Sequence, residues 1–259
     1  MRFKQQTIIV TGSGYGLGKA VALAFAREGG NVVLAARSRD KLAAVADELR
    51  ALGTRPLVAV TDLARPADVE AMVTQTLATY GGIDVLVNNS GIAGPTALAR
   101  DITADEWNEV IDVNLNGAFY CCKHCCGPMI EARRGVMINV GSVAGRFGYP
   151  RRTPYAASKW GLIGLNHSLA EELGEFGIRV NAVLPGPILG ERIKNVIRDR
   201  AAAEGRTYEY VEKAFTRMLA LKRMPTEEEV AELVLFLASD AARSITGQAY
   251  QVDGGQRMQ

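Results

Sequence analysis

The chain reads Thr11-Gly12-Ser13-Gly14-Tyr15-Gly16-Leu17-Gly18 directly after a short apolar run at residues 7–10 and before a helical pattern at residues 20–26. Glycines in such a turn permit positive φ angles and let the backbone approach a phosphate group closely. The free amides and the dipole of the following helix attract negative charge. This strand–turn–helix context predicts binding of a dinucleotide pyrophosphate, and the alternative interpretation is a tight turn with a purely structural role.

Further apolar runs rich in β-branched residues recur along the chain, and the stretches between them are long enough for helices. The runs are continuously apolar, as expected for parallel strands that helices cover on both faces. We therefore predict an α/β fold with a doubly wound, seven-stranded parallel sheet, in a single domain over residues 1–259. The predicted strands are residues 7–10, 31–35, 57–60, 85–87, 136–140, 179–183 and 249–252.

Two capping boxes support this order of elements. Thr103 with Glu106, and Thr226 with Glu229, form a pattern in which the hydroxyl and the carboxylate satisfy free amides at a helix start. The segment of about residues 187–225 is richer in charge and lies between two predicted elements. We predict that it is a helical excursion that covers a site.

The composition excludes several classes of partner. The 30 basic and 28 acidic residues leave a net charge of +2, so no strong field attracts nucleic acid or an anionic membrane. The longest apolar runs, such as residues 233–238, are much shorter than the ~20 residues that a membrane-spanning helix needs. The first residues lack the apolar region and cleavage site of a secretory signal, so we expect a cytoplasmic location.

All four cysteines lie within residues 121–126, next to His124. Zinc sites usually take a second pair of ligands from another segment, but only His167 is left to supply one. We therefore predict no metal site. The cysteines are expected to pack as small apolar side chains in a buried helix.

The end of the second predicted strand bears on the choice of cofactor. An acidic residue there would accept hydrogen bonds from the ribose hydroxyls, but the sequence is Ala35-Ala36-Arg37-Ser38-Arg39. Arginine offers charge-assisted, bidentate hydrogen bonds to a 2′-phosphate. We predict NADP(H) in preference to NAD(H). NAD(H) is the alternative if Arg37 and Arg39 are only solvated charges at a helix start.

A second set of motifs follows the glycine-rich turn. Asp62-Leu63, Asn88-Asn89-Ser90-Gly91 and Pro185-Gly186 each come after a predicted strand, and Ser142 precedes Tyr155-Ala156-Ala157-Ser158-Lys159. In this order, with Asn114 upstream, the motifs resemble the short-chain dehydrogenase/reductase family, and in particular its single-domain, 3-oxoacyl-reductase-like members, nearly from end to end. The resemblance implies a Rossmann-type fold and an oxidoreductase that binds a nicotinamide cofactor.

The resemblance also implies two groups of site residues. The catalytic residues would be Asn114, Ser142, Tyr155 and Lys159. The cofactor would be bound by Gly12, Ser13, Tyr15, Gly16, Leu17, Gly18, Arg37, Ser38, Asp62, Leu63, Asn89, Ser90, Gly91, Tyr155, Lys159, Pro185, Gly186 and Ile188. Two positions depart from the family pattern: Ser90 stands where alanine is usual, and residues 187–191 lack a threonine that often touches the cofactor.

The spacing of Tyr155 and Lys159 predicts a chemical role for the pair, because residues four apart share one face of a helix. The ammonium then lowers the pKa of the phenol from about 10 toward working pH. We predict that Tyr155 is the general acid in carbonyl reduction and the general base in alcohol oxidation, with Ser142 polarising the substrate oxygen. The resemblance implies that Lys159 also bonds the nicotinamide ribose and that Asn114 holds a water linking Lys159 to solvent. Taken singly, such a pair is more often a surface helix pair, and such a serine a turn residue.

The predicted substrate is a small molecule with a carbonyl or alcohol group: a 3-oxoacyl thioester, a sugar or polyol, or a small anionic alcohol. The segments that border the substrate cleft in this fold contain Arg146, Arg151, Arg152 and Arg192. Arginines there can bind a carboxylate, sulfonate or phosphate bidentately, or they can be solvated rim charges or subunit contacts.

A different class of function uses the same fold, namely a sensing or scaffold protein that binds a dinucleotide without turnover. The joint presence of Ser142, Tyr155 and Lys159 favours the enzyme. The segment 103–132 and the helix that begins near Tyr155 resemble the helices that family members pack against a two-fold mate. We therefore expect a homotetramer.

Overall fold

A parallel sheet forms the centre of the computed structural model, which describes residues 1–256. Its seven strands lie in the order β3-β2-β1-β4-β5-β6-β7, so the predicted doubly wound, seven-stranded sheet is confirmed. Each predicted strand is present, and several run slightly further than predicted. The bounds are β1 Thr7–Thr11, β2 Asn31–Ala36, β3 Leu57–Val60, β4 Val85–Asn88, β5 Gly135–Val140, β6 Ile178–Pro185 and β7 Ala249–Val252.

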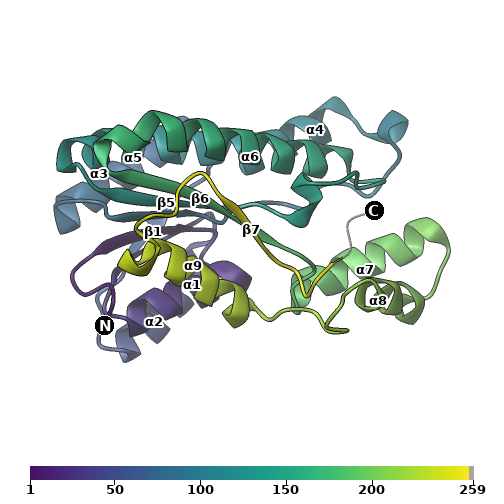
Figure 1. Ribbon diagram of the computed structural model, residues 1–259. Helices are drawn as coiled ribbons and strands as arrows, with labels where there is room; N and C mark the ends of the chain where they lie inside the picture. Colours follow the sequence, from purple (N-terminus) through teal and green to yellow (C-terminus); the bar gives the residue numbers. More distant parts are fainter. Residues whose placement is uncertain (257–259) are drawn as a thin grey trace.

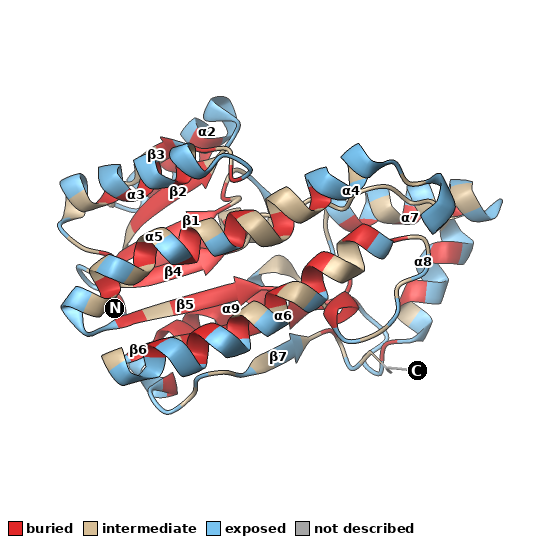
Figure 2. Ribbon diagram, turned by 90° about the horizontal axis from the view of Figure 1, so that it is seen from above, coloured by how far each residue is buried: buried red, intermediate tan, exposed pale blue. Residues whose placement is uncertain are grey.

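Helices cover both faces of the sheet (Figure 1). One face packs against α1 (Gly16–Arg27), α2 (Arg39–Ala51) and α9 (Glu227–Ala238), with Phe3 and Phe25 in edge-to-face contact 4.7 Å apart. The other face packs against α3 (Pro66–Tyr80), α5 (Gly117–Ala132) and α6 (Thr153–Leu173). The central strands are buried along their length (Figure 2), which explains their uninterrupted apolar sequence.

The strand order reverses beside β1, which pairs with β2 on one side and with β4 on the other. In sheets of this kind the connections leave β1 and β4 in opposite directions, and a crevice opens at the carboxyl ends of these strands. The glycine-rich turn follows β1 directly, so it lies at this crevice.

The predicted excursion after β6 is helical. It contains α7 (Glu191–Glu204) and α8 (Tyr208–Arg217), which lie beyond the carboxyl ends of the strands (Figure 1). The two helices share a small apolar core of their own that includes Ile197, Phe215 and Leu219. The excursion is therefore held together partly by its own packing, and the amides of Ala220 and Leu221 tie it to the carbonyls of Gly255 and Gly254 after β7.

The predicted helical segment 103–132 is interrupted once. Both predicted capping boxes are present, at the starts of α4 (Ala104–Ile111) and α9. A π-helical turn, Asp112–Asn116, separates α4 from α5, and it carries Asn114. Such turns change the direction in which neighbouring side chains point, and they are frequent at functional sites.

The four cysteines belong to α5, and their side chains pack against the core on its face of the sheet. Cys121, Cys122 and Cys125 are fully buried, and burial raises the pKa of Cys122 to about 12 and that of Cys126 to about 11. Within residues 1–256, no three histidines, cysteines or carboxylates lie together in a way that would hold a metal ion. These thiols are protonated packing groups.

A chain of buried amides crosses the middle of the molecule. Asn88 Nδ2 donates to Asn139 Oδ1 (3.0 Å), and Asn139 Nδ2 donates to Asn166 Oδ1 (3.2 Å). Asn166 Nδ2 in turn donates to the carbonyl of Gln248 (3.4 Å). The chain thus joins β4, β5, α6 and the residue that precedes β7, all of them beneath the crevice.

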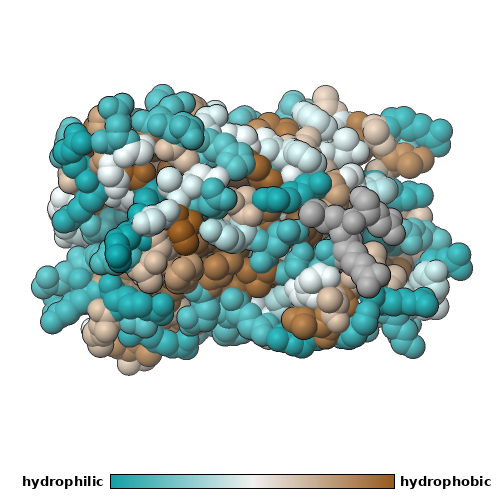
Figure 3. All heavy atoms as spheres, viewed as in Figure 1, coloured by the Kyte–Doolittle hydropathy of each residue, from teal (hydrophilic) through white to brown (hydrophobic). Residues whose placement is uncertain are grey.

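Some large apolar side chains remain exposed. Trp107 of α4, Phe119 of α5 and Trp160 of α6 are 39%, 45% and 53% exposed, and Phe236 projects from α9. Apolar residues also gather over α9 among more polar neighbours (Figure 3). None of the helices in the described part of the chain has the length and apolar character to cross a bilayer. The cytoplasmic location stays a prediction.

Candidate active site

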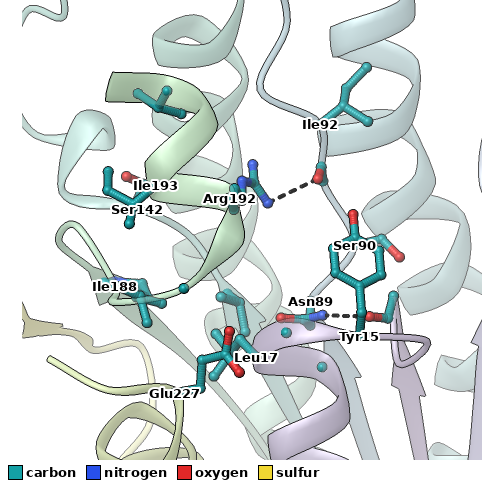
Figure 4. A pocket seen from close by; sticks show the side chains of 18 of the residues that line it. Tyr15, Leu17, Asn89, Ser90, Ile92, Ser142, Ile188, Arg192, Ile193 and Glu227 are labelled. Atoms are coloured by element: carbon teal, nitrogen blue, oxygen red, sulfur yellow. Dashed lines mark hydrogen bonds between the residues drawn. The ribbon is translucent and has the colours of Figure 1, made fainter. Parts of the chain in front are cut away.

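A cleft of about 1260 Å³ opens at the carboxyl ends of the strands and runs from the glycine-rich turn to α7. Figure 4 shows Ser142, Ile188 and Ile193 on one wall and Tyr15, Asn89 and Ser90 on the other. Arg192 reaches between the two walls, and its guanidinium donates to the carbonyl of Gly91 (3.1 Å). All of the predicted site residues line this cleft except Ser13 and Asn114, which are buried behind it.

The glycine-rich turn needs glycine at three positions. Gly12 and Gly16 have φ angles of +66° and +60°, a region that residues with a side chain rarely occupy. At Gly18 a Cβ atom would overlap the carbonyl oxygen of Gly12 and lie 2.5 Å from Asn89 Nδ2. Asn89 holds the turn in place, since its Nδ2 donates to the carbonyl of Thr11 (2.9 Å).

The start of α1 is open to an anion. Tyr15 occupies the N-cap position without a capping hydrogen bond, and the first turn has no acidic residue. The backbone amides there are therefore available to a ligand. Ser13 is fully buried, and its Oγ has no hydrogen-bond partner among residues 1–256. A cradle of this shape, with amides and a hydroxyl unsatisfied, fits the pyrophosphate of a dinucleotide.

The Gly18→Ala variant tests the turn. The added methyl group is expected to lower the free energy of unfolding by about 1–3 kcal/mol, as overpacking usually does, and to weaken dinucleotide binding. Gly164 in α6 is the control because a Cβ there meets no atom within 4 Å, so Gly164→Ala is expected to stabilise the helix by about 0.5–1 kcal/mol. Denaturant unfolding and cofactor fluorescence measure both effects. Wild-type stability and binding in Gly18→Ala would contradict the role of the turn.

The far end of the cleft carries Arg37, Ser38, Asp62 and Leu63. Ser38 caps α2, because its Oγ accepts from the amide of Lys41 (3.5 Å). Arg37 is exposed and forms no ion pair with any residue in the range 1–256. A free guanidinium at the end of β2 has the position and the charge to meet a ribose phosphate.

The other end of the cleft holds the predicted chemical residues. Tyr155 and Lys159 lie on one face of α6, and the Lys159 ammonium is 5.8 Å from the centre of the Tyr155 ring. Lys159 Nζ donates to the carbonyl of Val140 (2.9 Å), which fixes the ammonium at the end of β5. Ser142 follows that strand two residues later, and its Oγ accepts from the amide of Ala144 (3.1 Å).

The surroundings of Tyr155 make its phenol more acidic than usual. Burial raises the pKa of Tyr155, but the positive charges of Lys159 and Arg192 and the hydrogen bond of Ser142 outweigh burial and hold the pKa below 10.0. Burial also lowers the pKa of Lys159, so the ammonium gives up its proton more readily than a surface lysine. The pair is suited to proton transfer.

Asn114 is tied to the same end of the cleft, from behind. Its Oδ1 accepts from the amide of Ile92 (2.7 Å), while its Nδ2 donates to the Ile92 carbonyl (3.1 Å) and to Ser158 Oγ (3.1 Å). A Cβ on Gly91 would lie 3.2 Å from Asn114 Oδ1 and 3.6 Å from Lys159 Nζ. Gly91 therefore lies close to both Asn114 and Lys159, although Asn114 itself does not line the cleft.

The residues that the resemblance assigns to the nicotinamide lie together at the end of β6 and directly after it. Gly186 follows β6, and its amide donates to the carbonyl of Val252 (3.1 Å). A side chain on Gly186 would collide with Asp253, whose Cβ would be 2.7 Å away. Pro185 and Ile188 line the cleft beside it.

The four arginines that the sequence left open behave differently. Arg146 points to the sheet edge, where its guanidinium donates to the carbonyl of Ala249 (2.9 Å). Arg151 does not line the cleft, whereas Arg152 and Arg192 do. The sequence reasoning missed Glu227, which lines the cleft and whose Oε1 would lie 3.4 Å from a Cβ on Gly16 and 2.8 Å from one on Gly190. In the sequence, Glu227 appears only as the first residue of a capped helix, which does not indicate that it lines a cleft.

Comparison with known proteins agrees with this geometry. A family model described as enoyl-(acyl carrier protein) reductase matches residues 12–257. A curated relative, 3-oxoacyl-[acyl-carrier-protein] reductase FabG of Staphylococcus aureus (strain N315), is 38% identical over 254 residues, which cover 98% of each chain. The chain belongs to the short-chain dehydrogenase/reductase family. It is an NAD(P)-dependent oxidoreductase that acts on carbonyl groups, so the resemblance found in the sequence is confirmed.

Solved structures place this short-chain dehydrogenase/reductase among enzymes with different substrates. Levodione reductase superposes with a TM-score of 0.93 at 32% identity, and the match covers 98% of each chain. NAD⁺-bound xylitol dehydrogenase gives a TM-score of 0.96 at 28% identity, over 98% of this chain and 100% of that one. A variant of actinorhodin polyketide ketoreductase with NADPH gives 0.93 at 31%, over 97% and 98%.

Proposed function

We propose that this protein reduces a small carbonyl compound, or oxidises the corresponding alcohol, with NADP(H) as cofactor and Tyr155 as the general acid and base. The observation that carries the proposal is the Lys159 ammonium 5.8 Å from the centre of a phenol ring whose pKa is lowered. This pair lies in the same cleft as the dinucleotide turn. When bound, the nicotinamide supplies or accepts the hydride.

The residues of the chain then handle the proton and the substrate. Ser142 positions and polarises the substrate oxygen by hydrogen bonding. Tyr155 donates its proton to that oxygen in reduction and removes it in oxidation. Lys159 keeps the phenol acidic. As in the family that the chain belongs to, Lys159 would also hold the cofactor ribose, and Asn114 would hold a water that links Lys159 to solvent.

The remaining predicted residues hold the cofactor. The turn from Gly12 to Gly18 binds the pyrophosphate at the start of α1. Asp62 and Leu63 would hold the adenine, and residues 89–91 with Pro185, Gly186 and Ile188 would hold the nicotinamide half, since all of them line the cleft. NADP(H) rather than NAD(H) is proposed because the unpaired Arg37 stands where an acidic residue would select a free ribose.

An Arg37→Asp variant tests the choice of cofactor. Loss of a charge-assisted bond to the 2′-phosphate is expected to weaken NADPH binding about 10–100-fold, with the added carboxylate repelling the phosphate further. NADH binding stays the same or improves. Titration of both cofactors by nicotinamide fluorescence measures the ratio, and Arg39→Asp at the start of α2 is the control. An unchanged ratio of NADPH to NADH affinity would count against NADP preference.

The reaction itself is tested by a panel of ketones, sugars, polyols, thioesters and anionic carbonyl compounds, assayed with both cofactors by nicotinamide absorbance. Reduction of at least one carbonyl class is expected, since NADPH favours the reductive direction. Tight cofactor binding without turnover of any compound would favour a sensing or scaffold role on the same fold.

We further propose a homotetramer. Two exposed apolar surfaces support this proposal. One consists of Trp107, Phe119 and Trp160, on α4, α5 and α6. The other is the apolar patch over α9 (Figure 3). Two such surfaces on different sides are what a dimer of dimers uses. Light scattering at micromolar concentration is expected to give four times the mass of one chain, and a monomer would overturn the proposal.

A further inference from the structure

Arg152 is a buried cation at the chemical end of the cleft. The residue is only 4% exposed, yet it lines the cleft. Its Nη1 donates to Thr96 Oγ1 (2.9 Å) and its Nη2 to the carbonyl of Ala93 (2.9 Å). These neutral partners hold the guanidinium in one orientation from the side of the loop after β4.

The charge of Arg152 is not balanced. Across residues 1–256 no carboxylate lies within ion-pair distance of its guanidinium, and its buried Nε has no hydrogen-bond partner. A buried charge with only neutral partners is costly, and proteins usually compensate it with an opposite charge. An anion in the cleft would supply that compensation.

The unpaired charge is close to the reacting groups. The Arg152 guanidinium lies 5.7 Å from the centre of the Tyr155 ring and 5.9 Å from that of Tyr149. Arg192 approaches the Tyr155 ring from α7 at 6.0 Å, and it too forms no ion pair with a described residue. With Lys159, three cations surround one phenol.

Several other charges of the cleft have partners or lie away from Tyr155. Arg200 pairs with Glu204 (2.8 Å), and Glu191 pairs with Lys194 (2.5 Å). Glu227 faces Gly16 at the dinucleotide end.

Beyond the three cations around the phenol, Arg37 and Lys41 are the other cleft cations without an ion pair among residues 1–256, and both lie at the dinucleotide end. At the chemical end, the unpaired positive charge of Arg152 and Arg192 lies where the substrate would contact Tyr155.

We infer that the substrate is a small ketone or alcohol that carries an oxyanion, and that Arg152, with Arg192, binds this group beside the reacting carbon. The inference rests on the proposed function and specifies its substrate class. A guanidinium presents two parallel donors to carboxylate, sulfonate or phosphate oxygens. The Arg152 guanidinium lies 5.7 Å from the centre of the Tyr155 ring. A substrate that bonds both residues therefore has its oxyanion only a few bonds away from its carbonyl group.

Matched substrate pairs test the inference. Each pair joins an anion to its neutral counterpart: acetoacetate and its methyl ester, 2-oxopropane-1-sulfonate and the corresponding methyl sulfone, dihydroxyacetone phosphate and dihydroxyacetone. The neutral N-acetylcysteamine thioester of acetoacetate represents the thioester class. In at least one pair we expect kcat/KM for the anion to exceed that of the neutral partner about 10–100-fold, as for other charge-assisted hydrogen bonds. The pair that responds identifies the oxyanion.

Variants assign the effect to the arginines. Arg152→Met is expected to remove the preference, because kcat/KM for the anion falls about 10–100-fold further than kcat/KM for its neutral partner. Arg146→Met is the matched control, since Arg146 lies on the neighbouring loop and bonds the sheet edge instead. If Arg152→Met fails to fold, Arg192→Met carries the test, because Arg192 is exposed and its loss leaves no buried partner charge.

The outcomes separate the two proposals. Turnover of neutral ketones or the thioester as efficiently as the anions overturns the anionic substrate and leaves the proposed reductase intact. An anion preference that survives both Arg152→Met and Arg192→Met also overturns it. Absence of turnover with every compound and both cofactors overturns the proposed reductase, and the inference with it.

Discussion

Replacement of Tyr155 by phenylalanine is expected to lower kcat about 10²–10⁴-fold, the usual contribution of a positioned general acid or base. The variant loses one oxygen atom and keeps the ring that packs near Tyr149 and Arg152. Its fold and its affinity for NADPH should therefore stay close to those of the wild type. Steady-state rates with the best substrate of the panel, together with cofactor fluorescence, measure the two quantities separately.

The control for this variant is Tyr250→Phe, which removes the same atom from an exposed ring on β7. Its activity should equal that of the wild type. A Tyr155→Phe enzyme that turns over substrate near the wild-type rate would refute the acid/base role. A loss of NADPH binding along with activity would instead point to a structural role for the hydroxyl.

The Lys159→Met variant is expected to shift the pH profile in a defined direction. The positive charge of Lys159 helps to hold the pKa of Tyr155 below its ordinary value, so its removal raises that pKa. In the proposed mechanism, alcohol oxidation needs the Tyr155 phenolate. The oxidation rate of the variant should therefore rise with pH along a limb displaced about 1–3 pH units toward alkaline values. At neutral pH the rate falls by the corresponding factor of about 10–1000.

Lys213 on α8 provides the control, because it is exposed and does not line the cleft. Lys213→Met should leave the pH profile in place. A Lys159→Met profile that keeps the wild-type midpoint at reduced height would mean that Lys159 only binds the cofactor and does not tune the phenol.

The sequence was sufficient for the sheet and for the two ends of the cleft, because these depend on local patterns. A continuous apolar run predicts a buried parallel strand. The glycines of residues 12–18 follow the family pattern, and they are required by positive φ angles and by close contacts within the turn and with Asn89. Tyr155 and Lys159 are brought together by helical spacing alone.

Features that depend on distant contacts could not be predicted in this way. The sequence of the segment gives no sign of the π-helical turn at Asp112–Asn116, whose Asn114 forms hydrogen bonds with Ile92 and Ser158, both distant in the chain. The sequence alone does not distinguish Arg146 from Arg152, because both are arginines of the loop between Ser142 and Tyr155. Only the fold decides that one meets the Ala249 carbonyl and the other is enclosed near the phenol.

The row of amides from Asn88 to Asn166 has a consequence for the precision of catalysis. Asn88 and Asn139 face each other in register on adjacent strands, and each strand continues into one part of the site: Ser90 after the first, Ser142 after the second. Asn166 belongs to the helix that carries Tyr155. If any one of these elements shifted, a buried amide would lose its hydrogen-bond partner without gaining water, which would cost free energy. In the proposed mechanism, this buried row of amides therefore fixes the distances between Ser90, Ser142 and Tyr155, although none of the three asparagines lines the cleft.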